Sequence, residues 1–234
     1  MKILAVECSA SAASCAIIEN GKIIAHALTN TAVTHSQTLM PSVDFVLKIA
    51  NLTVKDIDAF AVAAGPGSFT GIRIGISAVK GLALPENKDC ISVSSLLGMA
   101  YSNRNTDGIL CAVMDARCSQ VYNALFEIKN GEISRLTEDR AVTCECLAAE
   151  LKEKYSDKKI TVTGDGTGVF MPYAENVCAA DTTVRYQNAC GIAAAAEQLY
   201  LSGEKVSAKE LCPIYLRLPQ AERELKAKLQ GEIK

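Results

Sequence analysis

The stretch Gly-Pro-Gly-Ser-Phe-Thr-Gly-Ile-Arg-Ile-Gly, residues 65–75, is the segment from which the fold is interpreted. It follows a run of small and apolar side chains, residues 59–64, which predicts a buried strand. It leads into residues 72–84, whose pattern predicts a helix. A glycine-rich turn between a strand and a helix start places backbone N–H groups where they can face a ligand or a partner. A tight connection with no ligand fits this local pattern about equally well.

The composition is that of a globular protein. The chain has 234 residues, enough for two small domains with a substantial core. Hydrophobic residues make up 49% and charged residues 21%, and no apolar stretch approaches the length of a membrane span. The net charge of −2 gives little attraction for nucleic acid. If the chain serves RNA chemistry, another protein is expected to supply most of the RNA-binding charge.

The ten cysteines are scattered along the chain and include no Cys-x-x-Cys pair. Most lie in apolar runs, where cysteine behaves as a small hydrophobic residue. This usage predicts a reducing compartment, the cytoplasm, and not a disulfide framework. The tightest pair is Cys144 and Cys146, at an expected helix start, and a metal or redox site there is disfavoured.

An internal repeat divides the chain into two similar halves. Residues 18–23 and 128–133 both place Asn-Gly between β-type segments, a strong signal for a two-residue hairpin turn. Upstream of each, an apolar strand ends at an acid, Glu7 or Asp115. Each half is therefore expected to open with three strands, followed by helices and further strands. The polar linker 103–108 predicts two domains, residues 1–103 and 104–234.

Four further segments resemble those of one protein family. They are the opening strand 3–9, the helix start His35-Ser36-Gln37, the motif Asp115-Ala116-Arg117, and Pro-Ile-Tyr-Leu-Arg at 213–217. With the glycine-rich loop they span residues 3–217, and together they resemble the bacterial TsaB (YeaZ) family. Members of this family are non-catalytic paralogues of TsaD, the enzyme that makes threonylcarbamoyladenosine in tRNA. The resemblance implies a two-lobed α/β fold of the actin/Hsp70/sugar-kinase (ASKHA) type.

The resemblance also implies a function. The chain is expected to form a complex with a TsaD-like catalytic subunit and a TsaE-like ATPase, and to reach tRNA only through that complex. The complex transfers a threonylcarbamoyl group to the adenosine next to the anticodon. This chain would contribute a structural or allosteric surface and no catalytic group, and it would form a homodimer when TsaD is absent. No membrane partner is expected.

A partner surface is predicted on two helices of the first half. Small residues on helix 72–84 recur at spacings of four, three and three, and such a stripe lets another helix approach closely. Glycine costs a helix about 1 kcal/mol relative to alanine, so several glycines imply a packing reason. Helix 36–50 carries apolar residues on more than one side, although packing of the two helices on each other is an alternative. The interface candidates are His35, Met40, Val43, Leu47, Gly71, Arg73, Gly75, Ala78 and Gly81.

A degenerate nucleotide cleft is the second predicted site. ASKHA enzymes hold Mg²⁺ with acids at strand ends and phosphates with glycine loops. The resemblance therefore leaves ATP or ADP with Mg²⁺ at a complex interface as a cofactor alternative, and an ATP-dependent phosphotransferase as an alternative function. The simpler interpretation, that these residues shape hairpins and cap turns, is favoured. The cleft candidates are Glu7, Ser9, Gly65, Gly67, Ser68, Asp115, Arg117, Gly164 and Asp165.

Two details bear on these alternatives. Glu7-Cys8 replaces the aspartate-threonine pair commoner in the family, which weakens the expectation of phosphate binding there. Arg117 is expected either to clamp a phosphate or partner carboxylate or to pair with Asp115 or another neighbour.

A metallopeptidase of the M22 type is the last alternative. The chain has only His26 and His35 and no His-x-x-x-His pair, so no metal ligand is assigned. His35 is expected to cap or pack at a helix start, with Thr34 as the N-cap.

Overall fold

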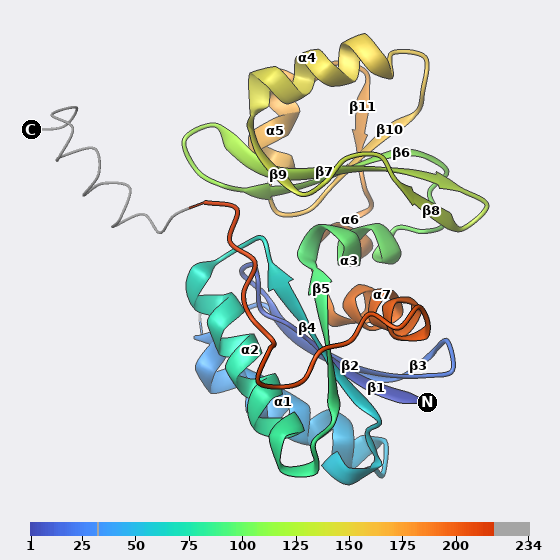
Figure 1. Ribbon diagram of the computed structural model, residues 1–234. Coiled ribbons are helices and arrows are strands. Elements are labelled where there is room, and N and C mark those ends of the chain that lie inside the picture. The colour runs from blue at the N-terminus through green and yellow to red at the C-terminus, as the bar shows by residue number, and fades with distance from the viewer. Residues whose placement is uncertain (32, 218–234) are drawn as a thin grey trace, which may run out of the picture.

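The computed structural model describes residues 1–31 and 33–217 (Figure 1). The last 17 residues of the second predicted domain, 218–234, lie outside the described part of the chain. All ten cysteines are free thiols. Within the described residues, no helix combines the length and the apolar character needed to cross a membrane.

Two sheets with matching strand order form the framework. The first sheet has the order β3-β2-β1-β4-β5, and the second has the order β8-β7-β6-β10-β11, with β9 added beside β7. In both, the first strand of the half is central, antiparallel to the next strand and parallel to the one on its other side. The first-sheet strands are β1 (Lys2–Glu7), β2 (Ala13–Glu19), β3 (Lys22–Thr29), β4 (Ala59–Gly65) and β5 (Asp89–Ser94). The second-sheet strands are β6 (Gly108–Asp115), β7 (Gln120–Lys129), β8 (Glu132–Arg135), β9 (Arg140–Thr143), β10 (Ile160–Thr163) and β11 (Val177–Ala179).

This equivalence confirms the internal repeat. Both predicted Asn-Gly turns form hairpins, between β2 and β3 and between β7 and β8. All four turn residues have positive φ, 48° and 80° at Asn20 and Gly21, and 53° and 81° at Asn130 and Gly131. Asn and Gly are the residues that adopt this left-handed backbone most readily, so the same dipeptide closes both hairpins.

The helices form layers on the faces of the two sheets (Figure 1). Helices α1 and α2 cover the outer face of the first sheet, α7 and α3 lie between the sheets, and α4 and α5 cover the outer face of the second. The α-helices are α1 (His35–Ile49), α2 (Phe69–Ala83), α3 (Ser95–Ser102), α4 (Cys144–Lys154), α5 (Thr167–Phe170), α6 (Thr182–Arg185) and α7 (Ala189–Leu201). Short 3-10 helices η1 (Val54–Asp56), η2 (Leu84–Glu86) and η3 (Met171–Tyr173) complete the set.

The chain returns to the first lobe near its C-terminal end. Helix α7 packs on β1, β2, β4 and β5, opposite α1 and α2. Val206 then pairs with Cys90 of β5, and Leu211 joins the core under α1 and α2. The division at residue 103 stays a prediction, and residues 189–211 complete the core of the lobe that precedes it.

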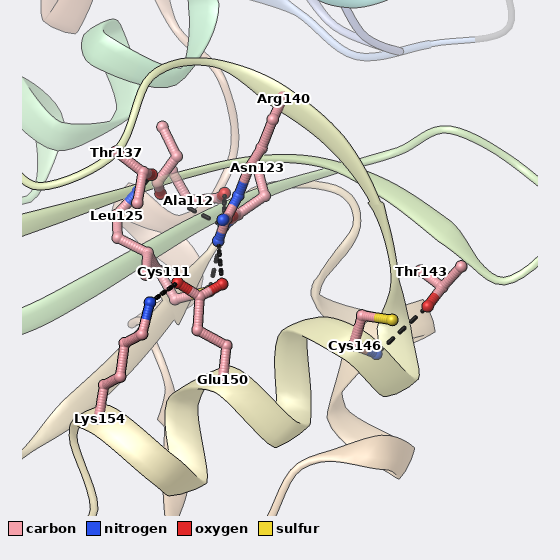
Figure 2. A network of polar contacts seen from close by, with 11 residues as sticks. Cys111, Ala112, Asn123, Leu125, Thr137, Arg140, Thr143, Cys146, Glu150 and Lys154 are labelled. Carbon is pink, nitrogen blue, oxygen red and sulfur yellow. Dashed lines mark hydrogen bonds and ion pairs between the residues drawn. The ribbon is translucent and has the colours of Figure 1, made fainter.

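The outer helix of the second lobe is held by a polar network (Figure 2). The Arg140 guanidinium donates to Glu150 Oε2 at 2.5 Å and to Asn123 Oδ1 at 3.0 Å, and Lys154 Nζ donates to Glu150 Oε1 at 3.1 Å. Asn123 in turn donates to the carbonyl of Ala112. These bonds join β6, β7, β9 and α4. They also give the remaining polar atoms of the partly buried Arg140–Glu150 ion pair hydrogen-bond partners, which such a pair needs to be stable.

The closely spaced cysteines have local roles at the start of α4. Cys144 is buried in the second-lobe core, while Cys146 is exposed. The backbone N–H of Cys146 donates to Thr143 Oγ1 at 3.2 Å, so Thr143 is the N-cap of the helix (Figure 2).

The two lobes meet where α3 crosses α7. A Cβ atom at Gly191 of α7 would overlap the carbonyl oxygen of Gly98 and the Ser102 hydroxyl of α3. The helices therefore approach each other at a distance that only glycine permits, and this crossing fixes the spacing of the two sheets.

We expect Gly191→Ala to destabilise the protein by about 2 kcal/mol or more, because the new methyl group meets backbone that cannot move independently. The control is Gly81→Ala in α2, where a Cβ would have no neighbour within 4 Å. That change should stabilise the protein by up to about 1 kcal/mol through helix propensity. Urea denaturation measures both, and equal effects at the two positions would contradict the close crossing.

Candidate functional site

The end of β1 buries an acid between the lobes. Glu7 is the last residue of the strand and only 1% exposed. Its Oε1 atom accepts the backbone N–H of Ser9 at 2.5 Å. Glu7 Oε2 and Ser9 Oγ are both buried and have no hydrogen-bond partner among the described residues. A buried carboxylate with one unsatisfied oxygen is costly to ionise.

Electrostatics link Glu7 to two acids of the second lobe. Burial raises the pKa of Glu7 to about 7, against the hydrogen bonds from Ser9, and the negative charge of Asp165 raises it further. Burial also raises the pKa of Asp165, where the hydrogen bond from Gln187 opposes the shift and the charge of Asp115 adds to it. Among the predicted cleft residues, Asp165 thus lies close enough to act on Glu7, and Asp115 lies close enough to act on Asp165.

The glycine-rich loop is packed on the turn that follows β1. A Cβ at Gly67 would overlap the carbonyl oxygen of Ser9, and a Cβ at Gly71 would overlap that of Cys8. The backbone N–H of Ser68 donates to the Ser9 carbonyl at 2.8 Å. The Ser68 hydroxyl accepts the Gly71 N–H as the N-cap of α2. This cap explains why α2 begins at Phe69, three residues before the predicted start.

The turn at residues 164–166 packs against the end of β6, the strand of the second lobe that is equivalent to β1. Gly164 has a φ of 107°, and a Cβ there would overlap the carbonyl oxygen of Val113 on β6. Arg117, which follows β6, is exposed, and its backbone N–H donates to Asp115 Oδ1 at 2.7 Å. Its guanidinium makes no ion pair or hydrogen bond with another described residue, so the expected pairing with Asp115 is a backbone contact instead.

The glycine-rich loop does not present a free backbone N–H at Ser68 for a nucleotide phosphate. Across residues 1–31 and 33–217, no three His, Cys, Asp or Glu side chains are grouped so that they could hold a metal ion. The loop N–H of Ser68, which a phosphate would need, is bonded to the Ser9 carbonyl. Among the described residues of the turn after β1, two buried side-chain atoms have no hydrogen-bond partner, Glu7 Oε2 and Ser9 Oγ. These are the polar atoms that a ligand could still bond there.

A segment near the C-terminal end crosses the glycine-rich loop, and we call residues 213–217 the strap. The N–H of Ile214 donates to the Ala64 carbonyl at 2.8 Å, and the Ile214 carbonyl lies where a Cβ of Gly65 would be. Tyr215 stacks on Phe69, with 4.6 Å between ring centroids. Arg217 Nη1 donates to the carbonyl of Ala116 in the second lobe at 2.8 Å. The sequence marked the strap as a motif but gave it no role, because its contacts join residues more than 100 positions apart.

A groove lies between α1 and α2 on the outer face of the first lobe. Its lining combines apolar side chains with a hydroxyl- and guanidinium-bearing rim: Ser36, Leu39, Met40, Thr70, Arg73, Ile74, Ser77 and Ala78. Met40 is 45% exposed despite its apolar side chain. An exposed apolar groove with a polar rim is typical of a docking surface.

The structure divides the nine predicted interface residues. Met40, Arg73 and Ala78 line the groove, and Gly81 is exposed with open space around it. Four others are buried and face the chain's own core: Val43, Leu47, Gly71 and Gly75. A Cβ at Gly75 would lie 3.2 Å from Val62 of β4. The small residues occupy one arc of about 120° at about 100° per residue, but this arc runs from the buried side of the helix at Gly71 and Gly75 to the exposed side at Gly81, so it does not form one exposed stripe.

The start of α1 also differs from the expectation. Thr34 occupies the N-cap position, but its hydroxyl makes no capping bond and contacts Gln37 and Ser36 instead. His35 Nε2 lies 2.7 Å from the carbonyl oxygen of Ala10, so this ring holds the turn after β1. His35 therefore packs within the first lobe, which is one of the two roles predicted for it, capping or packing at a helix start.

The two matched sheets and the central α3–α7 layer define a two-lobed ASKHA-like α/β protein. The family model for TsaD, tRNA N6-adenosine threonylcarbamoyltransferase, matches residues 23–225. The chain is 33% identical to the tRNA threonylcarbamoyladenosine biosynthesis protein TsaB of Bacillus subtilis, over 95% of this chain and 96% of that one. It is 31% identical to the Escherichia coli TsaB, over 97% and 100%. The solved structure of YeaZ from Pseudomonas aeruginosa is similar with a TM-score of 0.81 at 27% identity, covering 92% of this chain and 99% of that one.

The chain belongs to the TsaB (YeaZ) family. The predicted family and the predicted two-lobed ASKHA-like fold are both confirmed.

We expect stability to fall as pH rises through the interval between the two pKa values of Glu7. The unfolded carboxyl ionises near pH 4.5, whereas the folded one stays protonated until about 7. Over that interval only the unfolded state loses its proton, which costs the folded state about 3 kcal/mol above pH 7. Asp165, whose pKa is also raised, acts in the same direction.

Glu7→Gln tests this directly, since the amide keeps an oxygen for the Ser9 N–H and cannot ionise. The variant should be more stable than the wild type at pH 8 and similar to it at pH 4.5. Urea denaturation across this range in EDTA measures the difference. A variant less stable than the wild type at pH 8 would show that Glu7 is stabilised as a carboxylate.

Proposed function

We propose that this chain is a non-catalytic subunit that binds a TsaD-like catalytic subunit and supports threonylcarbamoyl transfer to the adenosine next to the tRNA anticodon. The observation that carries the proposal is the open apolar groove between α1 and α2, in a chain whose close relatives are named for threonylcarbamoyladenosine biosynthesis. We place this activity in the cytoplasm, within an assembly that includes a TsaE-like ATPase. The same groove serves a homodimer when the catalytic subunit is absent.

The shape and chemistry of the groove suit one helix of a partner. Its apolar lining presents Met40 and Ile74 above the buried Leu39, and Ala78 leaves room for close approach. Met40 is flexible enough to fill gaps against a partner surface. Arg73 at the rim bonds Tyr215 through Nε but forms no ion pair with a described carboxylate, so its Nη atoms can receive an acid of the partner.

The surroundings of Glu7 support a role without chemistry of its own. The Glu7 carboxyl is buried and bonded to Ser9, and the glycine-rich loop bonds its own chain. The net charge of −2 supports an indirect route to tRNA, through the catalytic subunit. Neither the phosphotransferase nor the metallopeptidase alternative has an observation of this kind in its favour.

The test mixes the chain with TsaD from the same organism and measures the complex by size-exclusion chromatography with light scattering. Met40→Glu places a charge in the groove and should weaken the complex by about 30-fold or more, as loss of a buried interface anchor does. Phe45→Glu is the matched control. Phe45 lies on the same helix, is 52% exposed, and points about 140° away from Met40.

The control variant should bind within about threefold of the wild type. Equal loss in both variants would place the interface elsewhere on α1 or indicate misfolding, which circular dichroism distinguishes. No complex with folded wild-type protein would overturn the proposal. Magnesium-dependent nucleotide turnover by the isolated chain would then support the phosphotransferase.

A further inference from the structure

We propose that the strap, residues 213–217, couples occupancy of the α1/α2 groove to the second lobe, with Arg73 as the linking residue. This inference rests on the proposed function, because it takes the groove as the partner site. The coupling consists of a continuous set of contacts that begins in the groove and ends at the turn after β6. Each contact is made by a different side chain, so each can be removed separately.

The first contact joins the groove to the strap. Arg73 lines the groove and donates from Nε to the Tyr215 hydroxyl at 2.6 Å, with its guanidinium carbon 5.5 Å from the ring centroid. Nε and the ring hold one edge of the guanidinium, and its Nη atoms have no hydrogen bond to a described residue. A carboxylate on a partner helix in the groove would attract the Arg73 guanidinium and either weaken or reorient its hydrogen bond to the Tyr215 hydroxyl. Either change would alter the position of the Tyr215 ring.

The second contact fixes the strap to the glycine-rich loop. Tyr215 stacks on Phe69, the first residue of α2. The backbone N–H of Ile214 donates to the carbonyl of Ala64, near the end of β4. Pro66, Gly67 and the Tyr122 ring of β7 line the small hollow beside Ile214 and Tyr215, two side chains that remain partly exposed. The ring stack and the backbone hydrogen bond, and not burial, therefore hold the strap on the loop.

The third contact reaches the second lobe. Leu216 packs on the core cluster that contains Met114 and Ala116, and Arg217 donates to the Ala116 carbonyl at 2.8 Å. Ala116 follows Asp115, the acid that acts on Asp165 in the cleft. The strap is thus bonded to both lobes, and its position depends on the groove at one end and on the β6–β7 turn at the other.

The turn itself carries strain that makes it sensitive to the strap. Arg117, Cys118 and Ser119 have φ values of 63°, 53° and 53°, a run of left-handed conformations outside glycine. Such conformations persist only where surrounding contacts hold them. Two backbone bonds close the turn, from Ala116 N–H to the Gln120 carbonyl and from Gln120 N–H to the Arg117 carbonyl. The exchange rates of these two amides therefore report on the turn.

The experiment measures amide hydrogen exchange of Ala116 and Gln120 in the full chain, alone and with TsaD from the same organism. In the wild type, partner binding should change these rates by about fivefold or more, the size of a typical coupling between two sites. Tyr215→Phe removes the acceptor of Arg73 and keeps the stack on Phe69. Arg217→Ala removes the contact with Ala116 and leaves the groove untouched. Both variants should bind the partner and lose most of the exchange response.

Tyr186→Phe is the matched control, since Tyr186 is 43% exposed against 39% for Tyr215, and its hydroxyl contacts no described residue by a hydrogen bond. It should respond like the wild type. A complex that forms without an exchange response in the wild type, or a full response in both strap variants, would overturn the coupling alone. Absence of any wild-type complex would overturn the proposed function as well, and light scattering separates these cases.

Discussion

The close packing of the glycine-rich loop on the turn after β1 is the constraint on which the other features depend. The carbonyl groups of Cys8 and Ser9 occupy the space that side chains at Gly71 and Gly67 would need. This contact presses α2 against β1 and sets its distance from α1, so it determines the width of the groove. It also orders the turn that bonds Glu7, and it positions Phe69, on which Tyr215 stacks. One steric requirement at two glycines therefore positions the groove, the buried acid and the strap together.

The same packing changes the chemistry expected of the cleft. In a phosphate-binding loop the backbone N–H groups point at the ligand, and the glycines are needed for its close approach. Here the glycines are needed for close approach of the chain to itself, and the N–H of Ser68 bonds Ser9. A sequence that resembles a ligand loop thus forms an internal joint. The raised pKa of Glu7 is a consequence of that joint, because it excludes water from the carboxyl.

Much of the fold could be predicted from the sequence, because periodicity and turn chemistry act locally. Helix α1 (His35–Ile49) lies within one residue of the predicted range 36–50 at each end, and the Asn-Gly repeat identified the two matched halves. The strand β11 was missed, since three residues carry no periodic signal. The return of α7 to the first sheet could not be predicted either, since apolar helices with alanine faces fit either lobe.

The candidate sites were predicted less completely for the same reason. The acids Glu7, Asp115 and Asp165 were found because strand ends and glycine turns mark them. The burial of Gly75 and Val43 depends on which side of a helix meets the sheet, and a stripe of small residues does not specify this. The role of the strap depends on contacts between positions 73 and 215 and between 116 and 217, which no local pattern contains.

The two halves differ in the helices that cover their outer faces. In the first lobe two helices of 15 residues each, α1 and α2, lie side by side and leave apolar side chains between them. In the second lobe the element equivalent to α2 is α5, which has only four residues. The remaining outer helix, α4, presents Glu150 and Lys154 in a charged network (Figure 2). A duplicated framework has therefore kept its sheets alike while its outer helices diverged. The hollow beside α4 is lined by η3 and the residues after it, not by a second long helix. Among the described residues, a groove between two long neighbouring helices is therefore a feature of the first lobe.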